Sequence, residues 1–502
     1  MISDTLQKAR DFEAQYAPHI PAAERPAFHV TAPIGWINDP NGFSCYKGEY
    51  HLFYQHHPYS TNWGPMHWGH VKTRDFIRWE QLPVAIAPDT PADRDGCFSG
   101  SALELPDGRQ MLMYTGVYRM RRPDGRMEEF QQQCLAFGDG VNYEKYPGNP
   151  VLDGSDLPAG GSVLDFRDPK IWQEDGTFYM VAGNRTEDGS GAIRLFESKD
   201  GLKWTYSTTL DASRNEYGRM WECPDFFPLD GWRVLLVSPQ EMTAIGLEFH
   251  AGYGVAALLG SYDKASRHFE REAVQAVDYG TDFYAPQTLE TYDGRRIMIA
   301  WMQNWATTGS QPQGCRWFGQ MTLPRELELR DGRLIQNPVR ELANYHGRKV
   351  SYRDILLTAG EVSLHGVEGR LLDMTVTVRP VDGSPSYQTF KLRLAKDGNR
   401  ETVVRYKVAN STVRIDRTHS GFPYDIVNVR DFPVRPQGGA VKLRIVMDRY
   451  SLEVFVNDGE QAASMTLYTP QSAQAVSFEV TEGAARIDVE KYSLELGEES
   501  KS

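Results

Sequence analysis

Short apolar runs, each introduced by a glycine, recur through the first two thirds of the chain. They begin at Gly48, Gly108, Gly176, Gly231 and Gly294. Four of these glycines follow an aspartate, and Asp-Gly between apolar runs predicts a tight β-hairpin because both residues tolerate positive φ. The glycines are 55 to 68 residues apart, a period typical of propeller blades built from several short strands. The pattern predicts a five-bladed β-propeller over 27–335.

The chain before and after this repeat has a different pattern. Residues 3–17 have apolar positions at helical spacing, with Ser3 as a candidate N-cap, so 1–26 are expected to form a helical lead-in. Residues 336–352 read as a linker. From 353 to 497 apolar and polar residues alternate with period two, which predicts a β-sandwich of ~150 residues. The expected fold class is therefore all-β, a five-bladed propeller followed by a C-terminal sandwich.

Composition and charge argue against several classes of binding partner. The 502 residues carry a net charge of −13 and show no basic patch, which argues against nucleic acid as a partner. No apolar run approaches the roughly 20 residues that span a bilayer, and the first residues lack a secretory signal pattern. The five cysteines are odd in number and scattered, so we expect a reduced, cytoplasmic protein without membrane partners.

Counting back eight or nine residues from each glycine reaches one position of the preceding strand. That position holds in turn Asp39, Ser99, Asp168, Glu222 and Ala285. If the strand before each hairpin is the innermost of its blade, these side chains converge on the central channel. Three carboxylates would then meet in one polar pocket, and the charged loops 117–130 and 153–164 are expected at its rim.

Asp39 and Asp168 each have an ordinary alternative interpretation. Asp39 lies in Trp36–Gly42, whose Asn, Asp, Pro and Gly residues could form a plain turn. Asp168 follows Arg167, and the two could be a surface ion pair. The functional interpretation is that the nearby cation keeps Asp168 ionised by lowering its pKa.

Glu222 is surrounded in sequence by Trp221, Cys223 and two phenylalanines. An apolar setting raises the pKa of a carboxyl group, as a general acid near neutral pH requires. Asp225 is the competing carboxylate in this segment, and the register favours Glu222.

Aromatic residues also cluster near the register position. They are Trp36, Trp63, Phe98, Trp221 and Trp301. Each alone is typical of a core, but as a set they suit the apolar faces of sugar rings. Two carboxylates flanking a glycosidic bond are the minimal equipment of a retaining glycosidase. Several histidines are present, but their spacing predicts no metal site, and we expect no cofactor.

At this point the sequence resembles the β-fructofuranosidases of glycoside hydrolase family 32. The segments that carry the resemblance are Trp36–Gly42, Phe53–Gln55, Asn62–Gly64, Phe98–Ser101, Phe166–Pro169, Trp221–Asp225, Ala300–Trp301 and Glu453–Glu460. The resemblance implies that Asp39 is the nucleophile, Glu222 the general acid/base and Asp168 the transition-state stabiliser. It also implies a set of substrate-binding residues, namely Asn38, Gln55, Trp63, Phe98, Ser99, Arg167 and Trp301.

The resemblance implies release of terminal β-D-fructofuranosyl units from sucrose, sucrose 6-phosphate or short fructo-oligosaccharides. A fructosyltransferase on the same scaffold, an inverting pentosidase and a non-catalytic fructan-binding protein are the alternatives. Recognition of a phosphate would need cations on the rim, for which the candidates are Arg119, Arg121, Arg122 and Arg316. The expected partner is a small fructoside, and the sandwich edges could support a homodimer.

Overall fold

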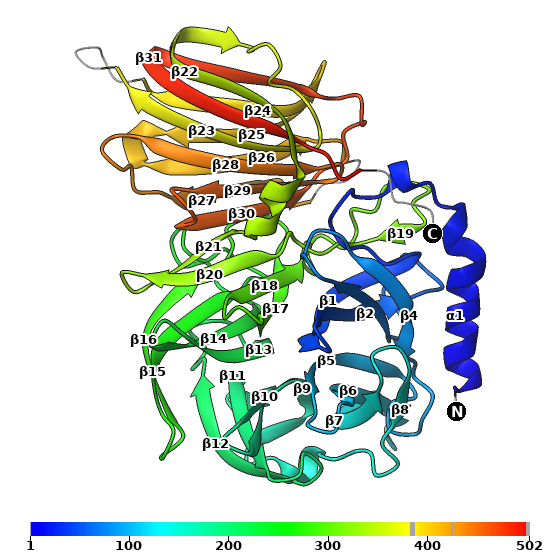
Figure 1. The fold of residues 1–502 in the computed structure, drawn as a ribbon. Coiled ribbons are helices and arrows are strands. Elements are labelled where there is room, and N and C mark those ends of the chain that lie inside the picture. The colour runs from blue at the N-terminus through cyan, green and yellow to red at the C-terminus, as the bar shows by residue number, and fades with distance from the viewer. Residues whose placement is uncertain (1, 382–386, 423–425, 498–502) are drawn as a thin grey trace.

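The computed structural model describes residues 2–381, 387–422 and 426–497. Five antiparallel sheets surround a common centre, and a larger arrangement of strands stacks beside them (Figure 1). The innermost strands β1, β5, β9, β13 and β17 lie nearest the centre of the ring. The predicted fold class, a five-bladed propeller followed by a sandwich of strands, is confirmed.

Each blade has four strands in chain order. Blade I consists of β1 (Gly35–Tyr46), β2 (Glu49–His57), β3 (His67–Thr73) and β4 (Glu80–Ile86). Blade II consists of β5 (Gly96–Glu104), β6 (Gln110–Arg121), β7 (Met127–Gly138) and β8 (Tyr143–Lys145). Blade III consists of β9 (Gly161–Glu174), β10 (Thr177–Thr186), β11 (Gly191–Ser198) and β12 (Trp204–Ala212). Blade IV consists of β13 (Met220–Leu229), β14 (Trp232–Gln240), β15 (Ala256–Asp263) and β16 (His268–Ala276). Blade V consists of β17 (Tyr284–Glu290), β18 (Arg296–Trp301), β20 (Arg325–Arg330) and β21 (Arg333–Pro338).

The five glycines of the repeat form the turns between the first and second strands of the blades. Their φ angles lie between 72° and 85°, a region that residues with a Cβ rarely adopt. In blades I, III and IV the preceding residue, Lys47, Asp175 or Asp230, also has positive φ. Two successive positive φ angles are the signature of the two-residue turn whose twist matches its strands.

The ring closes between its first and last blades. β19 (Trp317–Phe318) follows β18 of blade V but pairs in parallel with β1 of blade I. The expected N-terminal helix is α1 (Asp4–Tyr16), and the Ser3 hydroxyl accepts a hydrogen bond from the Leu6 amide at 3.1 Å. Leu6 and Ala9 pack against Val84 and Ala87 at the outer strand of blade I. Short 3₁₀ helices complete the first domain: η1 (Ala17–His19), η2 (Ala22–Glu24) and η3 (Gly154–Asp156).

The C-terminal strands run in the order β27-β26-β25-β24-β31-β23-β28-β29-β30, with β22 paired to β31. The first five are β22 (His346–Val362), β23 (Leu372–Pro380), β24 (Thr389–Asp397), β25 (Arg400–Lys407) and β26 (Thr412–His419). The others are β27 (Val429–Pro433), β28 (Val441–Asp448), β29 (Ser451–Val456), β30 (Gln461–Thr466) and β31 (Ala475–Leu494), and η5 (Val408–Asn410) joins β25 to β26. The long β31 pairs with β24 near its start and with β23 near its end, so it joins the two halves of the sandwich.

The segment 336–352, expected as a linker between the two domains, consists of ordered elements. It contains the end of β21, the 3₁₀ helix η4 (Arg340–Tyr345) and the first part of β22. β22 begins at His346, ahead of the expected start of the sandwich at 353, because 346–352 pair with β31. None of residues 346–352 is fully buried, so this edge of the sandwich lacks the apolar alternation that would reveal its pairing.

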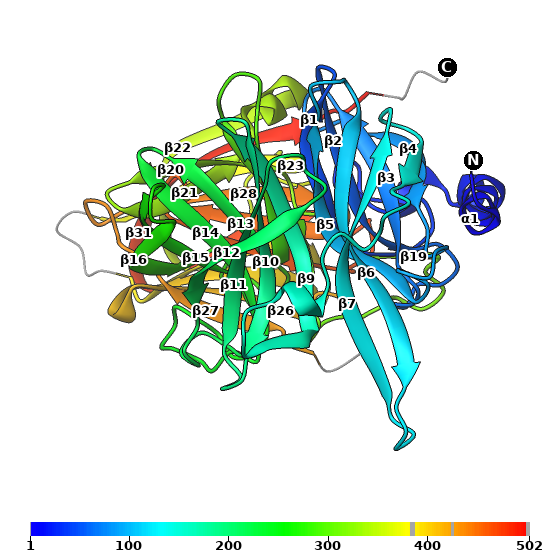
Figure 2. The ribbon, with the colours of Figure 1, turned by 90° about the horizontal axis from the view of Figure 1, so that it is seen from below.

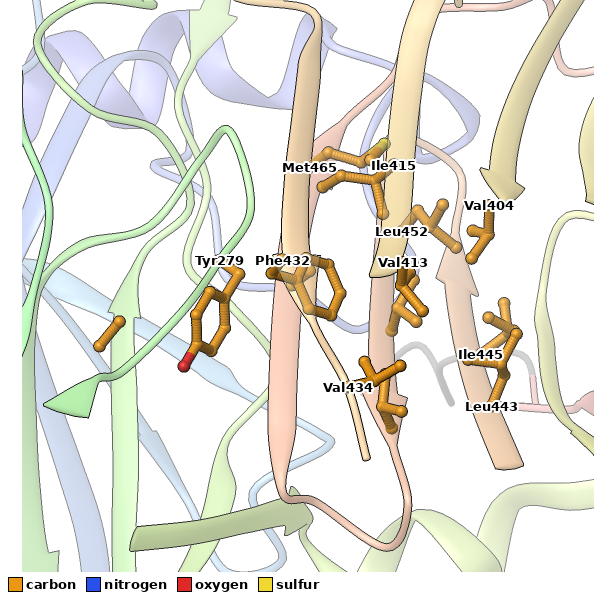
Figure 3. Close-up of a cluster of buried hydrophobic side chains, with 14 of the residues drawn as sticks. Tyr279, Val404, Val413, Ile415, Phe432, Val434, Leu443, Ile445, Leu452 and Met465 are labelled. Carbon is orange, nitrogen blue, oxygen red and sulfur yellow. The ribbon is translucent and has the colours of Figure 1, made fainter. Parts of the chain in front are cut away.

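The core of the sandwich reaches the propeller directly. Figure 3 shows Val413, Ile415 and Phe432 among the buried apolar side chains of this core. Tyr279, from the segment between β16 and β17, stacks on Phe432 with ring centroids 5.1 Å apart. The two domains therefore share apolar surface, and the sandwich is not a tethered appendage.

A fully buried charge network also crosses this interface. His29, ahead of β1, lies 2.9 Å from a carboxylate oxygen of Asp448 and 3.0 Å from one of Glu453. Arg325 at the start of β20 donates to Glu453 at 3.1 Å and to Asp278 at 2.9 Å. Every one of these side chains is inaccessible to solvent. Each charge has a partner, as buried charges require.

We predict that this network makes stability fall as the solution becomes alkaline. Burial opposes protonation of His29, but its hydrogen bonds and the charges of Asp448 and Glu453 outweigh burial and raise its pKa from 6.5 to about 9. The stabilisation is complete below pH 6.5 and is lost as pH rises through 9, on the order of 3 kcal/mol in all. Thermal melting from pH 6 to 10 should show this fall. The variant His29→Gln should melt at a lower temperature than the wild type at pH 6, and its melting temperature should depend much less on pH. A variant whose melting temperature falls with pH as steeply as that of the wild type would contradict the role given to His29.

Candidate active site

A β-bulge interrupts the innermost strand of every blade at a similar point. The interruptions lie at Ile37–Pro40, Phe98–Gly100, Arg167–Lys170, Glu222–Asp225 and Tyr284–Gln287. Successive residues of a regular strand point to opposite faces, whereas a bulge redirects a side chain. All five bulges lie in the strands nearest the centre of the ring, which Figure 1 labels β1, β5, β9, β13 and β17.

The bulges correct the register inferred from the glycines. Asp168, Cys223 and Ala285 all have positive φ and all precede a proline. They therefore occupy equivalent positions in blades III to V. We call this the shared position, and Glu222 lies one residue before it. Counting back from the glycines does not reveal this offset of one residue, because the number of residues between glycine and bulge differs among the blades. β1 has a second bulge, and the turns of blades II and V are longer than the two-residue turns of blades III and IV.

One cavity of ≈ 400 Å³ nevertheless receives nine of the ten predicted site residues. These nine are Asn38, Asp39, Gln55, Trp63, Phe98, Ser99, Arg167, Asp168 and Glu222. Because they come from blades I to IV, they meet only through closure of the ring. The three carboxylates predicted to act together thus share one cavity, as the convergence argument requires.

Asp39 is held by one of its two carboxylate oxygens. The Ser99 hydroxyl donates to Oδ2 at 2.8 Å, and the Cys223 thiol lies 3.6 Å from the same oxygen. Oδ1 has no hydrogen-bond partner among the described residues. Burial, followed by the charge of Glu222, raises the pKa of Asp39 to about 6. The carboxylate is therefore fixed in place while one oxygen stays available.

Glu222 has polar neighbours, contrary to the apolar setting expected from its sequence. Arg167 Nε donates to Oε1 at 3.0 Å, and the Tyr284 hydroxyl donates to Oε2 at 2.6 Å. Arg167, Glu222 and Tyr284 hold the same position, immediately before the shared one, in three consecutive blades. Tyr284 is a site residue that the sequence reasoning missed, although Tyr284-Ala285-Pro286 parallels Arg167-Asp168-Pro169.

Asp168 differs from its expected electrostatic state. Arg167 Nε lies 4.0 Å from its Oδ2, whereas the Cys223 amide donates to that oxygen at 3.0 Å. Burial is the largest influence and, with the charges of Glu222 and Asp39, raises the pKa of Asp168 to about 7 although Arg167 opposes the shift. The expectation that Arg167 holds this pKa low is wrong, because complete burial outweighs a single cation that is shared with Glu222.

Trp301 is the predicted binding residue that does not line the cavity. It is completely buried and packs edge-on against Trp36 and Trp305, with centroids 5.9 and 5.2 Å apart. Trp305 lines the cavity instead. At the mouth, Trp63 is 40% exposed and meets Phe98 edge-to-face. A sequence count places Trp301 near the centre but cannot tell which of two nearby indoles faces the space.

Four further residues line the outer part of the cavity, and the sequence reasoning did not single them out. They are Glu129, Gln131, Leu164 and Asp165. They belong to β7 and β9 and lie at the ends of the charged segments 117–130 and 153–164 that were expected at the rim. The hairpin of β6 and β7 extends beyond the rest of blade II (Figure 2). The charged composition of these segments was thus the sequence feature that could have identified these lining residues.

Within 2–381, 387–422 and 426–497, no group of His, Cys, Asp and Glu side chains is arranged to hold a metal ion. Among the same residues, no helix has the length and apolar character needed to cross a membrane.

Comparison with known proteins identifies the family. The profile described as glycosyl hydrolases family 32 N-terminal domain matches residues 29–338, and the C-terminal profile of that family matches 341–494. A sucrose-6-phosphate hydrolase of Zymomonas mobilis is 38% identical, covering 91% of this chain and 88% of that protein. A raffinose invertase of Escherichia coli is 37% identical, covering 92% of this chain and 93% of that protein. The solved structure of a Bombyx mori GH32 beta-fructofuranosidase superimposes with a TM-score of 0.82 at 32% identity, covering 97% and 98% of the two chains. The chain therefore belongs to glycoside hydrolase family 32.

Proposed function

We propose that the protein is a retaining β-fructofuranosidase that releases terminal fructosyl units from small fructosides. The observation that carries this proposal is the meeting of Asp39, Asp168 and Glu222 in one cavity at the centre of a family 32 propeller. A cavity of ≈ 400 Å³ suits a substrate of a few sugar rings. Release of free fructose from sucrose or kestose, measured directly, tests the proposal.

In this mechanism Asp39 attacks the anomeric carbon of the fructosyl unit. The Ser99 hydroxyl holds Oδ2, so Oδ1 is the oxygen available to form the bond. The product of this step is a covalent fructosyl-enzyme, reached through a transition state with oxocarbenium character. A preoriented nucleophile lowers the entropic cost of the attack.

Glu222 is the general acid and then the general base. It protonates the leaving oxygen as Asp39 attacks, and it later takes a proton from the water that releases fructose. Arg167 and Tyr284 each bind one of its oxygens and so fix the carboxyl plane. Retention by this route requires the carboxyl groups of Asp39 and Glu222 to lie about 5–5.5 Å apart.

Asp168 accepts hydrogen bonds from fructosyl hydroxyls and stabilises the positive charge that develops at the anomeric centre. Asn38 and Gln55 complete the polar side of the subsite. The Trp36 indole fixes the Asn38 amide at 2.7 Å, and Gln55 is anchored by donating to the Cys97 carbonyl at 2.9 Å. Trp63 and Phe98 offer apolar surface to the sugar.

We also propose a cytoplasmic location. All five cysteines are free thiols, which fits a reducing compartment. The homodimer stays a prediction.

Replacing Asp39 by Asn should lower kcat on sucrose by roughly 10³-fold or more, because a neutral amide replaces the anionic nucleophile while the size of the side chain is kept. Steady-state kinetics measure the loss, and circular dichroism with thermal melting should show an intact fold. A folded variant with near-normal turnover would remove Asp39 from its role.

Glu222→Ala should be rescued by a small nucleophile. Without the acid/base, the fructosyl-enzyme formed from a fructoside with a good leaving group is hydrolysed slowly, but azide needs no general base. Added azide should therefore accelerate turnover and give β-fructofuranosyl azide, which NMR identifies. An α-configured azide would overturn the retaining mechanism, and equal rescue of Asp39→Asn would contradict the division of roles.

The pH profile should fall on its acidic side as Asp39 and Asp168 gain protons. Their pKa values are about 6 and 7, and both groups act as anions, so kcat/KM should drop as pH decreases through this range. Ser99→Ala removes a hydrogen bond that lowers the pKa of Asp39, and the acidic limb should move to higher pH.

A matched control for this variant is Ser44→Ala. Ser44 is a buried serine of β1 whose hydroxyl donates to the Gly42 carbonyl instead of a carboxylate. The acidic limb of the pH profile of Ser44→Ala should lie at the same pH as that of the wild type. A limb that moves equally in both variants, or in neither, would contradict the role assigned to Ser99.

A further inference from the structure

The outer part of the cavity carries more negative charge than catalysis requires. Beyond the three proposed catalytic carboxylates, Glu129 and Asp165 also line it, and Arg167 is the one cation among the described residues that line it. The two outer carboxylates are about a quarter to a third exposed, at 30% and 25%. Asp165 shares Arg167 with Glu222, the proposed acid that protonates the leaving oxygen, so we take this part of the cavity to receive the leaving group.

Arg167 is already bound to other residues of the cavity. Nε and one terminal nitrogen each lie 3.0 Å from Glu222 Oε1. The other terminal nitrogen donates to Gln131 and to Asp165, both at 3.2 Å. A phosphate entering the cavity would have to displace these contacts.

The arginines of the rim are also engaged. Arg119 binds Glu129 through two nitrogens at 3.1 and 2.9 Å, and Arg122 binds Glu128 at 2.5 Å. Arg121 lies further out on the β6–β7 hairpin, opposite Met127 and towards the projecting tip (Figure 2).

Arg316, the remaining candidate for phosphate recognition, donates to the backbone carbonyl of His19. The four cations that the sequence offered for phosphate recognition are thus paired within the rim, placed towards its tip or bound elsewhere.

We infer that Glu129 and Asp165 determine specificity by selecting a neutral leaving group, so the natural substrate is an unphosphorylated fructoside such as sucrose rather than sucrose 6-phosphate. The inference rests on the proposed function. Carboxylates accept hydrogen bonds from neutral sugar hydroxyls, whereas they repel a phosphate of about −1.5 to −2 charge at pH 7. The net charge of −13 on the whole chain acts in the same direction.

Both residues are held in place, as a specificity element requires. Arg119 fixes one oxygen of Glu129, and Gln131 donates to the other at 3.3 Å. Asp165 is held by Arg167 through Oδ1 and by the Ser162 hydroxyl through Oδ2 at 3.1 Å. Neither carboxylate can therefore swing away from an incoming anion without breaking two contacts.

The test compares kcat/KM for sucrose and sucrose 6-phosphate on the wild-type enzyme at low and high ionic strength. We expect sucrose to be preferred by about tenfold or more at low salt. Added salt should raise kcat/KM for the phosphorylated sugar and leave that for sucrose unchanged, because screening acts only on the charged ligand. Equal values, a preference for sucrose 6-phosphate, or a gap that salt does not change would each overturn the inference.

The variants Glu129→Gln and Asp165→Asn remove one charge each with little change in shape. In each variant, the ratio of kcat/KM for sucrose to kcat/KM for sucrose 6-phosphate should fall by about threefold or more. Glu80→Gln is the matched control, since this glutamate is 64% exposed on β4, outside the cavity, and its ratio should equal that of the wild type. Ratios unchanged in both cavity variants would overturn the role of these residues. Absence of fructose release from every fructoside would instead contradict the proposed function, so the two failures are distinguishable.

Discussion

The site depends on one backbone constraint, the bulge in the innermost strand of each blade. In a regular strand, neighbouring side chains point to opposite faces, so only one of two successive residues can reach the channel. Here Asn38 and Asp39 line the same cavity, as do Arg167 and Asp168. The positive φ at Asp168 is a strained conformation for a residue with a Cβ, and it persists because the surrounding ring fixes it. Without the bulges, only one residue of each such pair could reach the cavity.

This crowding of side chains also sets the electrostatics. Carboxylates packed together and buried raise one another's pKa, and Arg167 offsets this only in part. Arg167 and Tyr284 each donate to one oxygen of Glu222, which makes a hydrogen-bonded chain that spans three blades. The same arrangement engages Arg167, the one cation among the described lining residues, so the proposed chemistry and the inferred specificity share one cause. An arginine that positions the proposed acid/base carboxylate is not free to bind a phosphate.

Most of the fold and much of the site could be predicted from the sequence. Glycine turns repeat in sequence because each needs positive φ, so the blades and their innermost strands could be counted. Asp39 and Asp168 followed from that count. Glu222 was reached by a register one residue away from the true one, since bulges and turn lengths leave no hydropathy signal. Which of Trp301 and Trp305 faces the cavity depends on side-chain packing between distant strands, and the same is true of the partner that Tyr284 finds in Glu222.

The role of the sandwich follows from where it touches the propeller. Asp448 and Glu453 clamp His29, which leads into blade I, while Glu453 also binds Arg325 of blade V. These are the first and last blades, and the seam between them also contains the short β19–β1 pairing and a hydrogen bond from the amide of Met321 to the carbonyl of Val30 at 2.8 Å. The Phe43 amide of blade I donates to the Gln287 side chain of blade V at 3.2 Å in the same seam. By binding both of these blades, the sandwich braces the seam. Asp39 stands on the strand that begins at the seam. A domain none of whose described residues lines the cavity therefore helps to hold Asp39, the proposed nucleophile, in register with the carboxylates of blades III and IV.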